Sequence, residues 1–402
     1  MRTTDRSTLR ASRALKWLLW VVAVIIGTYL SIVGVLLYDM TRRPPIPVAT
    51  VAEAPVEEPS PEYPPDFDLS DWSDEELIAQ MLIVMVPSDD IPGFYLLAQR
   101  GVGAIVLAGV TPTPRLVQEL ANAQDEAQRG IRMIVTSDEE GGDVAHLGAL
   151  LGRLPAPEEI AKLPPEEIRQ VTRAQGEVLR KAGVHAVLAP NLDLKVEGTY
   201  MAKNRRAFSA DPQVVADVGT VWMEGMHEAG VAVVVKHWPG IGSARDTHEA
   251  VTVLGDLKTL EQADLIPFNQ VITAGADMVM LGHVIVPGLS ENNSPVSLSP
   301  KAIDYIRQRS HPDLIIMTDS IDMTAATETL GLTHGQAAAR SVAAGADMVM
   351  MGAVDSVKIH AYLVKQLRSG DLSREHIEDS VARVLRFKYA HGLLDADLAV
   401  KE

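Results

Sequence analysis

Cysteine is absent from this chain of 402 residues. Without it the protein can have no disulfide scaffold, no thiolate metal site and no cysteine nucleophile. Three common catalytic motifs, GxxxxGK[ST], HExxH and GxSxG, are also missing from the sequence. Basic residues are scarce beyond position 43, where 29 Lys and Arg face 51 Asp and Glu, a net charge of −22. A region with this much negative charge repels polyanions, so we expect no nucleic-acid partner.

The first 43 residues differ from the rest of the chain, because they carry a net charge of +5. Within them, residues 17–38 form a run of 22 residues without a charge. As a helix this run would span a hydrocarbon core of roughly 30 Å. The apolar part of a cleaved signal peptide, the alternative, is usually only about 7–15 residues long and ends at a small-residue site. Residues 38–41 (YDMT) contain no such site, so the length and the flank favour an uncleaved anchor.

Basic residues also indicate the orientation of this segment, because five precede it and two follow it. This bias favours a cytoplasmic N-terminus and an exported body. We therefore predict a cytoplasmic segment at 1–16 and a signal-anchor helix at 17–38. Residues 39–66, rich in Pro and Glu, form a linker, and 67–395 form a folded domain. An exported domain without cysteine suggests a bacterial single-pass membrane protein.

From residue 67 onward, short apolar runs alternate with amphipathic stretches. The runs are continuous rather than alternating, as expected when both faces of a parallel sheet are covered. Eight strand–helix units in this length predict a (β/α)8 barrel, with a doubly wound open sheet as the alternative. The predicted strands are Met81–Val86, Gly103–Ala108, Met133–Thr136, Ala186–Ala189, Val231–Val235, Met278–Leu281, Leu314–Thr318 and Met348–Met351. The main predicted helices are Thr113–Gln128, Pro165–Ala182, Pro212–Ala229, Leu257–Ala274 and Thr333–Ala344.

Two copies of AGADMVM, at 274–280 and 344–350, mark equivalent joints between a helix and a strand. Their acidic residues, Asp277 and Asp347, stand where a strand begins. In a barrel that end carries stability rather than catalysis, so we predict structural roles for both. The methionines in the same runs are predicted to be core residues.

Polar residues follow the strands where a barrel places its site. The strand exits read SDEEGGDVAH (137–146), APNLDL (189–194), KHWPGIGSARDTH (236–248), GHV (282–284) and MTDSIDM (317–323). Each has an ordinary alternative, since Asp193 or Asp322 could cap a helix and His283 could bond a carbonyl. Residues 138–140 could be a solvated acidic turn. Ionisable groups directly after apolar strands are costly unless paired, so their convergence predicts a single site.

Asp246 and His248 form the most chemically specific pair. At i and i+2 of an extended loop their side chains share one side, so the carboxylate can orient the imidazole as a general acid/base. Asp319, directly after a strongly apolar strand, is the best nucleophile candidate. Lys236 and His237 supply donors for substrate hydroxyls. Gly240 and Gly242, with the preceding proline, would let the loop swing over a ligand.

The segments KHWPGIGSARDTH, DEEGGDV, NRRAF and TDSIDM resemble family-three glycoside hydrolases, and most of all the single-barrel bacterial β-N-acetylhexosaminidases. The resemblance runs from about Asp71 to residue 394. It implies a retaining, exo-acting hydrolase of terminal N-acetylglucosamine-type residues in cell-wall or chitin-like glycans, without a cofactor or metal. It also implies that Asp319 is the nucleophile, His248 the acid/base and Asp246 its orienting partner. The sugar-binding positions of the family fall on Asp138, Arg206, Lys236 and His237.

The chain departs from the family pattern at three positions of the strand exits. Asp143 and His146 stand where the family has arginines, and Ile241 replaces a histidine. His146 remains a candidate substrate-binding residue. The loss of two cationic contacts makes an anionic muropeptide a poorer fit.

Three alternatives remain at this stage. The barrel could be a non-catalytic, membrane-tethered glycan-binding protein, or a β-glucosidase-like enzyme. It could also be a metal-dependent hydrolase with a ligand set drawn from Lys236, His237, His248, His283 and Asp319. Against the metal site, the chain contains no His-x-His, and the adjacent Lys236 and His237 would point apart on a regular strand.

Overall fold

The computed structural model describes residues 67–109 and 115–394. The segments predicted at 1–16, 17–38 and 39–66 lie outside these residues. No helix in the described part of the chain is long and apolar enough to cross a membrane. The strands are β1 (Leu82–Pro87), β2 (Ala104–Ala108), β3 (Ile134–Ser137), β4 (Glu139–Gly141), β5 (Val144–Ala145), β6 (Ala186–Val187), β7 (Ala232–Trp238), β8 (Thr252–Val253), β9 (Met278–Leu281), β10 (Val284–Ile285), β11 (Ile315–Thr318) and β12 (Val349–Gly352).

Helices follow most of these strands. They are α2 (Asp74–Gln80), α3 (Ile91–Gln99), α4 (Leu116–Asp125), α5 (Gly148–Leu151), α6 (Pro157–Ile160), α7 (Pro165–Lys181), α8 (Tyr200–Lys203), α9 (Pro212–Glu228), α10 (Leu257–Glu261), α11 (Leu265–Thr273), α12 (Pro300–Arg307), α13 (Thr324–Thr327), α14 (His334–Ala344), α15 (Ala353–Ser369) and α16 (Arg374–Ala390). Short 3₁₀ turns lie at Gln128–Gly130, Val296–Leu298 and Glu328–Leu330.

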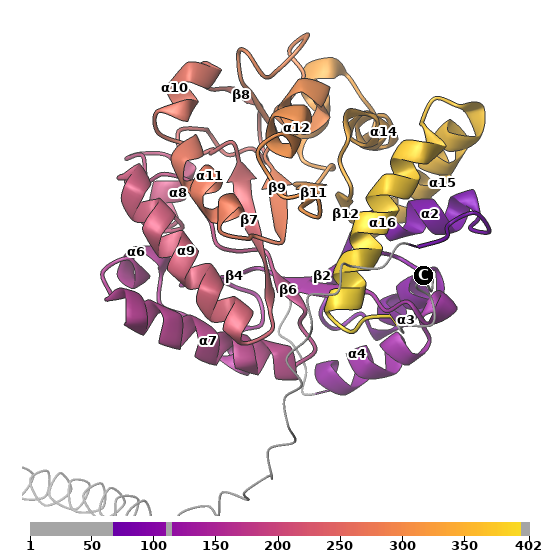
Figure 1. The fold of residues 1–402 in the computed structure, drawn as a ribbon, viewed down its shortest axis with the longest axis horizontal. Helices are drawn as coiled ribbons and strands as arrows, with labels where there is room; N and C mark the ends of the chain where they lie inside the picture. Colours follow the sequence, from indigo (N-terminus) through magenta and orange to yellow (C-terminus); the bar gives the residue numbers. More distant parts are fainter. Residues whose placement is uncertain (1–66, 110–114, 395–402) are drawn as a thin grey trace, which may run out of the picture. The chain divides into compact units, whose positions relative to one another are not determined.

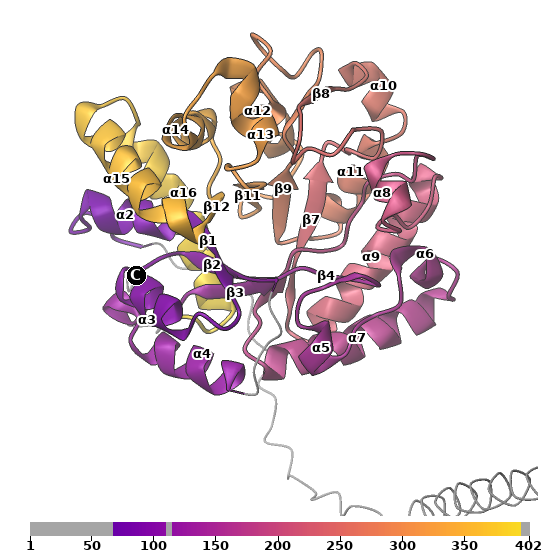
Figure 2. The same cartoon turned by 180° about the vertical axis from the view of Figure 1, so that it is seen from behind.

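Eight parallel strands form the main sheet, in the order β11-β9-β7-β6-β3-β2-β1-β12. The two end strands meet through a parallel bridge between Met317 and Met348. The amide of Thr318 also donates to the carbonyl of Met348, at 3.1 Å. The sheet therefore curls into a (β/α) barrel, and the open doubly wound alternative is wrong. Helices surround the strands in both views of the molecule (Figures 1 and 2).

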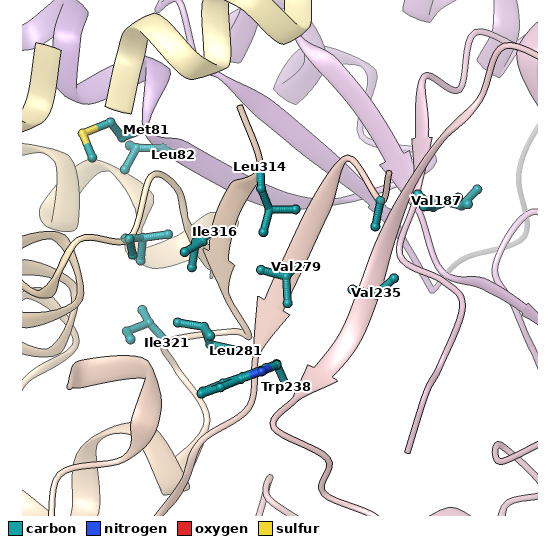
Figure 3. Close-up of a cluster of buried hydrophobic side chains, with 14 of the residues drawn as sticks. Met81, Leu82, Val187, Val235, Trp238, Val279, Leu281, Leu314, Ile316 and Ile321 are labelled. Atoms are coloured by element: carbon teal, nitrogen blue, oxygen red, sulfur yellow. The ribbon is translucent and has the colours of Figure 1, made fainter. Parts of the chain in front are cut away.

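Side chains along each barrel strand alternate between two buried clusters, which explains the continuous apolar runs. On β1, Leu82 and Val84 belong to the large cluster between sheet and helices, whereas Ile83 belongs to the cluster inside the barrel. Figure 3 shows Val279 and Ile316 of the outer cluster on neighbouring strands. The inner cluster contains the four methionines of the AGADMVM runs, which confirms that prediction: Met278, Met280, Met348 and Met350.

One predicted helix, Leu257–Ala274, is two helices in the structure, so that prediction was wrong. The first, α10, ends at Glu261, and α11 begins at Leu265. Pro267 explains the break, because it has no amide hydrogen for an interior helical hydrogen bond. In the first turn of α11 the missing hydrogen costs nothing.

The two AGADMVM joints are structurally equivalent. At the first, a carboxylate oxygen of Asp277 accepts the Val233 amide of the neighbouring strand at 2.9 Å. At the second, Asp347 accepts the Ile316 amide at 2.7 Å and also pairs with Arg307 and Arg383. Both carboxylates tie together adjacent strands at the end where the strands begin, in agreement with the predicted structural roles.

Candidate active site

A cavity of about 510 Å³ lies where the barrel strands end. Every predicted site residue lines it except Asp246, which bonds to His248. Met85 on β1, Met280 on β9 and Met350 on β12 contribute apolar lining. The remaining lining residues are Asp138, Val144, His146, Leu188, Tyr200, Met201, Arg206, Lys236, His237, Ile241, Thr247, His248, Asp319, Ser320, Asp322 and Met323. A larger cavity of about 600 Å³, against α2, α3 and α15, contains none of the predicted site residues.

Asp319 follows β11 directly and is half-buried in this cavity. Its side chain accepts the amide of Ser320 at 2.7 Å. Burial alone would raise the pKa of Asp319, but the neighbouring His237 ring and the Ser320 amide hold that pKa below its usual value. The carboxylate is therefore ionised at neutral pH, the state that a nucleophile requires.

His237 reaches the cavity from β7 with its ring held from behind by Asp193. Its Nδ1 lies 2.7 Å from a carboxylate oxygen of Asp193, so Nδ1 donates and Nε2 is left for other partners. Asp193 is fully buried and also accepts the amide of Ile241 at 2.7 Å. The apolar Ile241 side chain lines the cavity, while its backbone helps to fix the same carboxylate.

His283, at the end of β9, is fully buried. Its Nε2 lies 3.0 Å from the carbonyl oxygen of Ser320 and its Nδ1 2.7 Å from the hydroxyl of Ser297. Burial lowers the pKa of His283, so the ring is neutral. Because a carbonyl only accepts, Nε2 donates to it, and Nδ1 accepts the Ser297 hydroxyl. His283 thus supports the backbone beside Asp319, the ordinary role considered for it.

One wall of the cavity is a compact network of charged side chains. Lys236 is buried on β7 and donates to Asp138 and, at 2.7 Å, to Glu140. Arg206 binds both oxygens of Glu140, at 2.6 and 3.0 Å. Burial would raise the pKa of Glu140, but the two cations hold it far below its usual value. The network holds four polar side chains in fixed positions. These side chains therefore lose little conformational entropy when a ligand binds.

Asp246 and His248 lie on the loop after β7. The imidazole Nδ1 is 2.7 Å from a carboxylate oxygen of Asp246, which also accepts the His248 amide at 3.0 Å. This arrangement leaves Nε2 free of Asp246 to exchange a proton with a ligand. The His248 side chain is 62% exposed, so the predicted dyad stands at the mouth of the cavity.

The two glycines before this dyad have packing roles. Gly240 has a φ of +105°, which favours glycine. A Cβ on Gly242 would stand 2.1 Å from the carbonyl oxygen of Leu194. The loop therefore packs closely against the barrel at this point, and glycine is required whether or not the loop moves. The predicted swing of the loop stays a prediction.

The three positions that depart from the family pattern bring little positive charge to the cavity. His146 lines it, with Nδ1 donating to the carbonyl of Leu107 at 3.2 Å. Asp143 is exposed in the turn between β4 and β5. Ile241, the third position, is apolar and buried. Asp322, which is not one of the three, adds an exposed carboxylate to the lining and accepts the hydroxyl of Ser320.

Sequence reasoning left two important residues without a role. The alternative of a solvated acidic turn at 138–140 is wrong for Glu140, which is 2% exposed and joins Lys236 to Arg206. The alternative of a helix cap is wrong for Asp193, whose carboxylate bonds to the His237 ring. Among the described residues, no group of three or more His, Asp or Glu side chains is arranged to hold a metal ion.

Comparisons with known proteins agree with this architecture. Residues 74–387 match the family described as "Glycosyl hydrolase family 3 N terminal domain". The chain is 29% identical to Beta-hexosaminidase LpqI of Mycobacterium tuberculosis over 327 residues, covering 79% of this chain and 83% of that protein. It is 32% identical to a Beta-hexosaminidase of Xylella fastidiosa over 283 residues, covering 61% of this chain and 83% of that protein.

Two solved structures have the same fold. M. tuberculosis LpqI superposes with a TM-score of 0.72 at 28% identity, covering 79% of this chain and 94% of that one. A family 3 β-N-acetylglucosaminidase from Paenibacillus sp. gives a TM-score of 0.72 at 27% identity, covering 82% of this chain and 64% of that one. The family match extends over most of the chain and includes the strand ends that form the cavity, so this protein belongs to glycosyl hydrolase family 3.

Proposed function

We propose that this protein is a retaining, exo-acting β-N-acetylhexosaminidase, which removes terminal β-linked N-acetylglucosamine-type residues from cell-wall or chitin-like glycans. The observation that carries the proposal is one cavity shared by an ionised carboxylate, Asp319, and a carboxylate-oriented imidazole, His248. The relatives named as hexosaminidases support the choice of an N-acetylated amino sugar.

In the first step, a carboxylate oxygen of Asp319 attacks the anomeric carbon. The bond from that carbon to the glycosidic oxygen breaks, and its electron pair stays on the oxygen. His248 donates the Nε2 proton to this oxygen, and the leaving group departs as an alcohol. Asp246 stabilises the imidazolium through Nδ1 before the transfer.

In the second step, a water molecule attacks the anomeric carbon of the glycosyl ester on Asp319. His248 takes one proton from this water, and the carboxylate of Asp319 leaves with the bonding electron pair. The sugar departs as the hemiacetal, and both side chains return to their starting states. Two inversions at one carbon give net retention of configuration.

The charged wall is assigned to the hydroxyl groups of the terminal sugar. Lys236 and Arg206 are donors, Asp138 is an acceptor, and Glu140 keeps both cations in position. His237 and His146 also line the cavity and are assigned to substrate binding. The hydrogen bonds within the wall are made before substrate arrives, so little reorganisation is needed.

We also propose that residues 17–38 anchor the protein as a single span of a bacterial cell membrane, with the barrel outside the cytoplasm and residues 39–66 as the tether. The 22 uncharged residues and the excess of basic residues before them support this proposal. Protease added to intact spheroplasts should remove the barrel and leave a membrane-bound fragment. A barrel degraded only after the membrane is lysed would refute the orientation.

The test of the activity uses the full chain in mild detergent, with nitrophenyl β-N-acetylglucosaminide and nitrophenyl β-glucoside as substrates. Asp319→Asn should abolish release of nitrophenol from the acetylated substrate, because the amide is nearly isosteric but a much weaker nucleophile. Asn122→Asp, on the outer helix α4, is a matched amide–acid control and should leave the rate unchanged. Normal turnover by Asp319→Asn would refute the nucleophile, and faster release from the glucoside would refute the substrate.

A non-catalytic glycan-binding role is the second candidate. Two observations favour it. Asp143 and His146 stand where the family pattern has arginines, and His248, the group that must protonate the leaving oxygen, is exposed. A folded wild-type protein that binds N-acetylglucosamine oligosaccharides by calorimetry, but releases no sugar from them, would favour this role over the enzyme.

A further inference from the structure

Tyr200 is an aromatic residue of the cavity that has no role in the mechanism above. It is the first residue of the short helix α8, and its half-buried ring lines the cavity. The guanidinium carbon of Arg206 lies 5.7 Å from the centre of the ring, within the range of a cation–π contact. The His248 ring is 6.3 Å away, tilted by 53°. Tyr200 thus contacts both the charged wall and the proposed acid/base.

The exposure of these side chains shows which part of the cavity Tyr200 occupies. Lys236 is 2% exposed and Arg206 13%, whereas His248 is 62% exposed. In the proposed reaction, the terminal sugar of the glycan occupies the closed, charged end of the cavity. The rest of the glycan extends out through the open end. Tyr200 lies between the two, beside the group that protonates the oxygen joining them.

We propose that Tyr200 is the aromatic platform for the leaving-group sugar, so that the enzyme is selective for a glycan whose second residue is itself a sugar ring. The proposal rests on the proposed hexosaminidase function. A pyranose presents apolar C–H groups on its faces, and burying them against an aromatic ring is favourable. The contact of Arg206 with the ring limits its motion, which reduces the entropy cost of binding.

No other side chain that the structure describes in this part of the cavity lining offers a flat apolar surface for the leaving-group sugar. Asp246 and His248 are committed to proton transfer, and Thr247 between them is buried. The apolar Val144 and Met201 also line the cavity, but they lack the flat surface of an aromatic ring. Among the described residues that line the cavity, Tyr200 is the only Phe, Tyr or Trp.

The test compares two substrates that share the terminal sugar and differ in the leaving group. N,N′-diacetylchitobiose has a sugar ring there, whereas methyl β-N-acetylglucosaminide has only a methyl group. Both have poor leaving groups that need the acid. In Tyr200→Ala, kcat/KM for the disaccharide relative to the methyl glycoside should fall by about tenfold. Tyr200→Phe keeps the ring and should keep the ratio.

Tyr95→Ala is the control, because Tyr95 is also partly buried but bonds to Glu119 on α4, away from the cavity. It should leave the ratio at its wild-type value. An equal loss on both substrates in Tyr200→Ala would mean that the ring only positions His248 or Arg206, and would overturn the platform. If the ratio of the two kcat/KM values falls as much in Tyr200→Phe as in Tyr200→Ala, the effect belongs to the hydroxyl group and not to the ring.

Binding separates failure of this proposal from failure of the proposed function. Calorimetry on Asp319→Asn measures the affinity for the same two compounds without turnover. Adding Tyr200→Ala should weaken binding of the disaccharide by about tenfold and leave the methyl glycoside unchanged. If the wild-type protein releases no sugar from either compound, this binding result would refute the proposed enzyme activity and keep the platform. Equal affinities before and after the substitution would refute the platform.

Discussion

Lys388 offers a quantitative test of the electrostatics of the barrel. It is fully buried on α16, and its Nζ donates to the side-chain oxygen of Gln80 at 2.7 Å. This partner is a neutral amide rather than a carboxylate. Burial lowers the pKa of Lys388 from 10.5 to about 7. The folded state therefore disfavours a charge that the unfolded chain carries freely.

The size of the penalty follows from this shift. Each pKa unit corresponds to ~1.4 kcal/mol, so the change from 10.5 to about 7 corresponds to roughly 5 kcal/mol of lost stability at low pH. Lys388→Met removes the charge but keeps a flexible apolar chain. It also leaves the Gln80 oxygen without its donor, at a cost of about 1–3 kcal/mol. We expect a net gain of about 2 kcal/mol in the free energy of unfolding near neutral pH.

The sign of the effect should change with pH. The folded pKa lies below the unfolded one, so the unfolded state binds more protons between about pH 7 and 10.5, and wild-type stability rises with pH across that range. Above it the lysine is neutral in both states, and only the lost hydrogen bond remains. Lys388→Met should then be the less stable protein, by about 1–3 kcal/mol.

Urea unfolding of the full chain, followed by circular dichroism at several pH values, measures this difference. Lys365→Met, an exposed position on α15, is the matched control and should show a small difference that does not change with pH. If Lys388→Met is destabilised by the same amount at neutral and alkaline pH, the buried lysine carries no charge penalty and the reasoning is refuted.

Three further predictions concern the cavity. His248→Ala should slow hydrolysis of the methyl glycoside far more than that of the nitrophenyl glycoside, because nitrophenolate leaves without a proton; equal losses in kcat would remove His248 from the acid role. Glu140→Gln leaves Lys236 and Arg206 without their shared carboxylate and should lower the free energy of unfolding by about 3 kcal/mol, measured by urea unfolding against the exposed Glu126→Gln. Asp322→Asn should raise kcat/KM several-fold for a glycan with a carboxylate on its second sugar, and leave the neutral disaccharide unchanged; no change with the anionic glycan would show that Asp322 does not select against negative charge.

The barrel was predictable because its strands are buried on both faces. A run such as MVML at β9 is apolar at every position, since alternate side chains enter the inner and outer clusters. Boundaries were less predictable, because they depend on hydrogen bonds to neighbouring strands. Trp238 is an example, since it extends β7 by pairing with Leu281 of β9. The break between α10 and α11 could have been read from Pro267.

The site was predictable where one residue type fits one chemistry. Asp319 and the Asp246–His248 spacing stand out because a nucleophile and an oriented acid/base need those groups. Glu140 does not stand out, because three consecutive acidic residues suggest solvent exposure. Its role depends on Arg206, 66 residues further along the chain, and on Lys236 across the barrel. Charge balance was the available signal, since a buried Lys236 requires a carboxylate partner that is also buried.

Residues that depend on distant partners and residues that stand alone on the surface also differ in how freely they can be substituted. Glu140 bonds to Lys236 and Arg206. Removing one of the three would leave a charge without its partner inside the protein, so a tolerated substitution at one of them requires substitutions at the others. Asp143, Asp322 and His248 are exposed, so a substitution at one of them has little cost for the fold. Of the departures, Asp143 is exposed outside the cavity lining and His146 lines the cavity, while the charged wall and Asp319 have the residues that the family pattern implies. We therefore expect changes of this kind to alter the leaving group that the enzyme accepts and to leave the proposed mechanism intact.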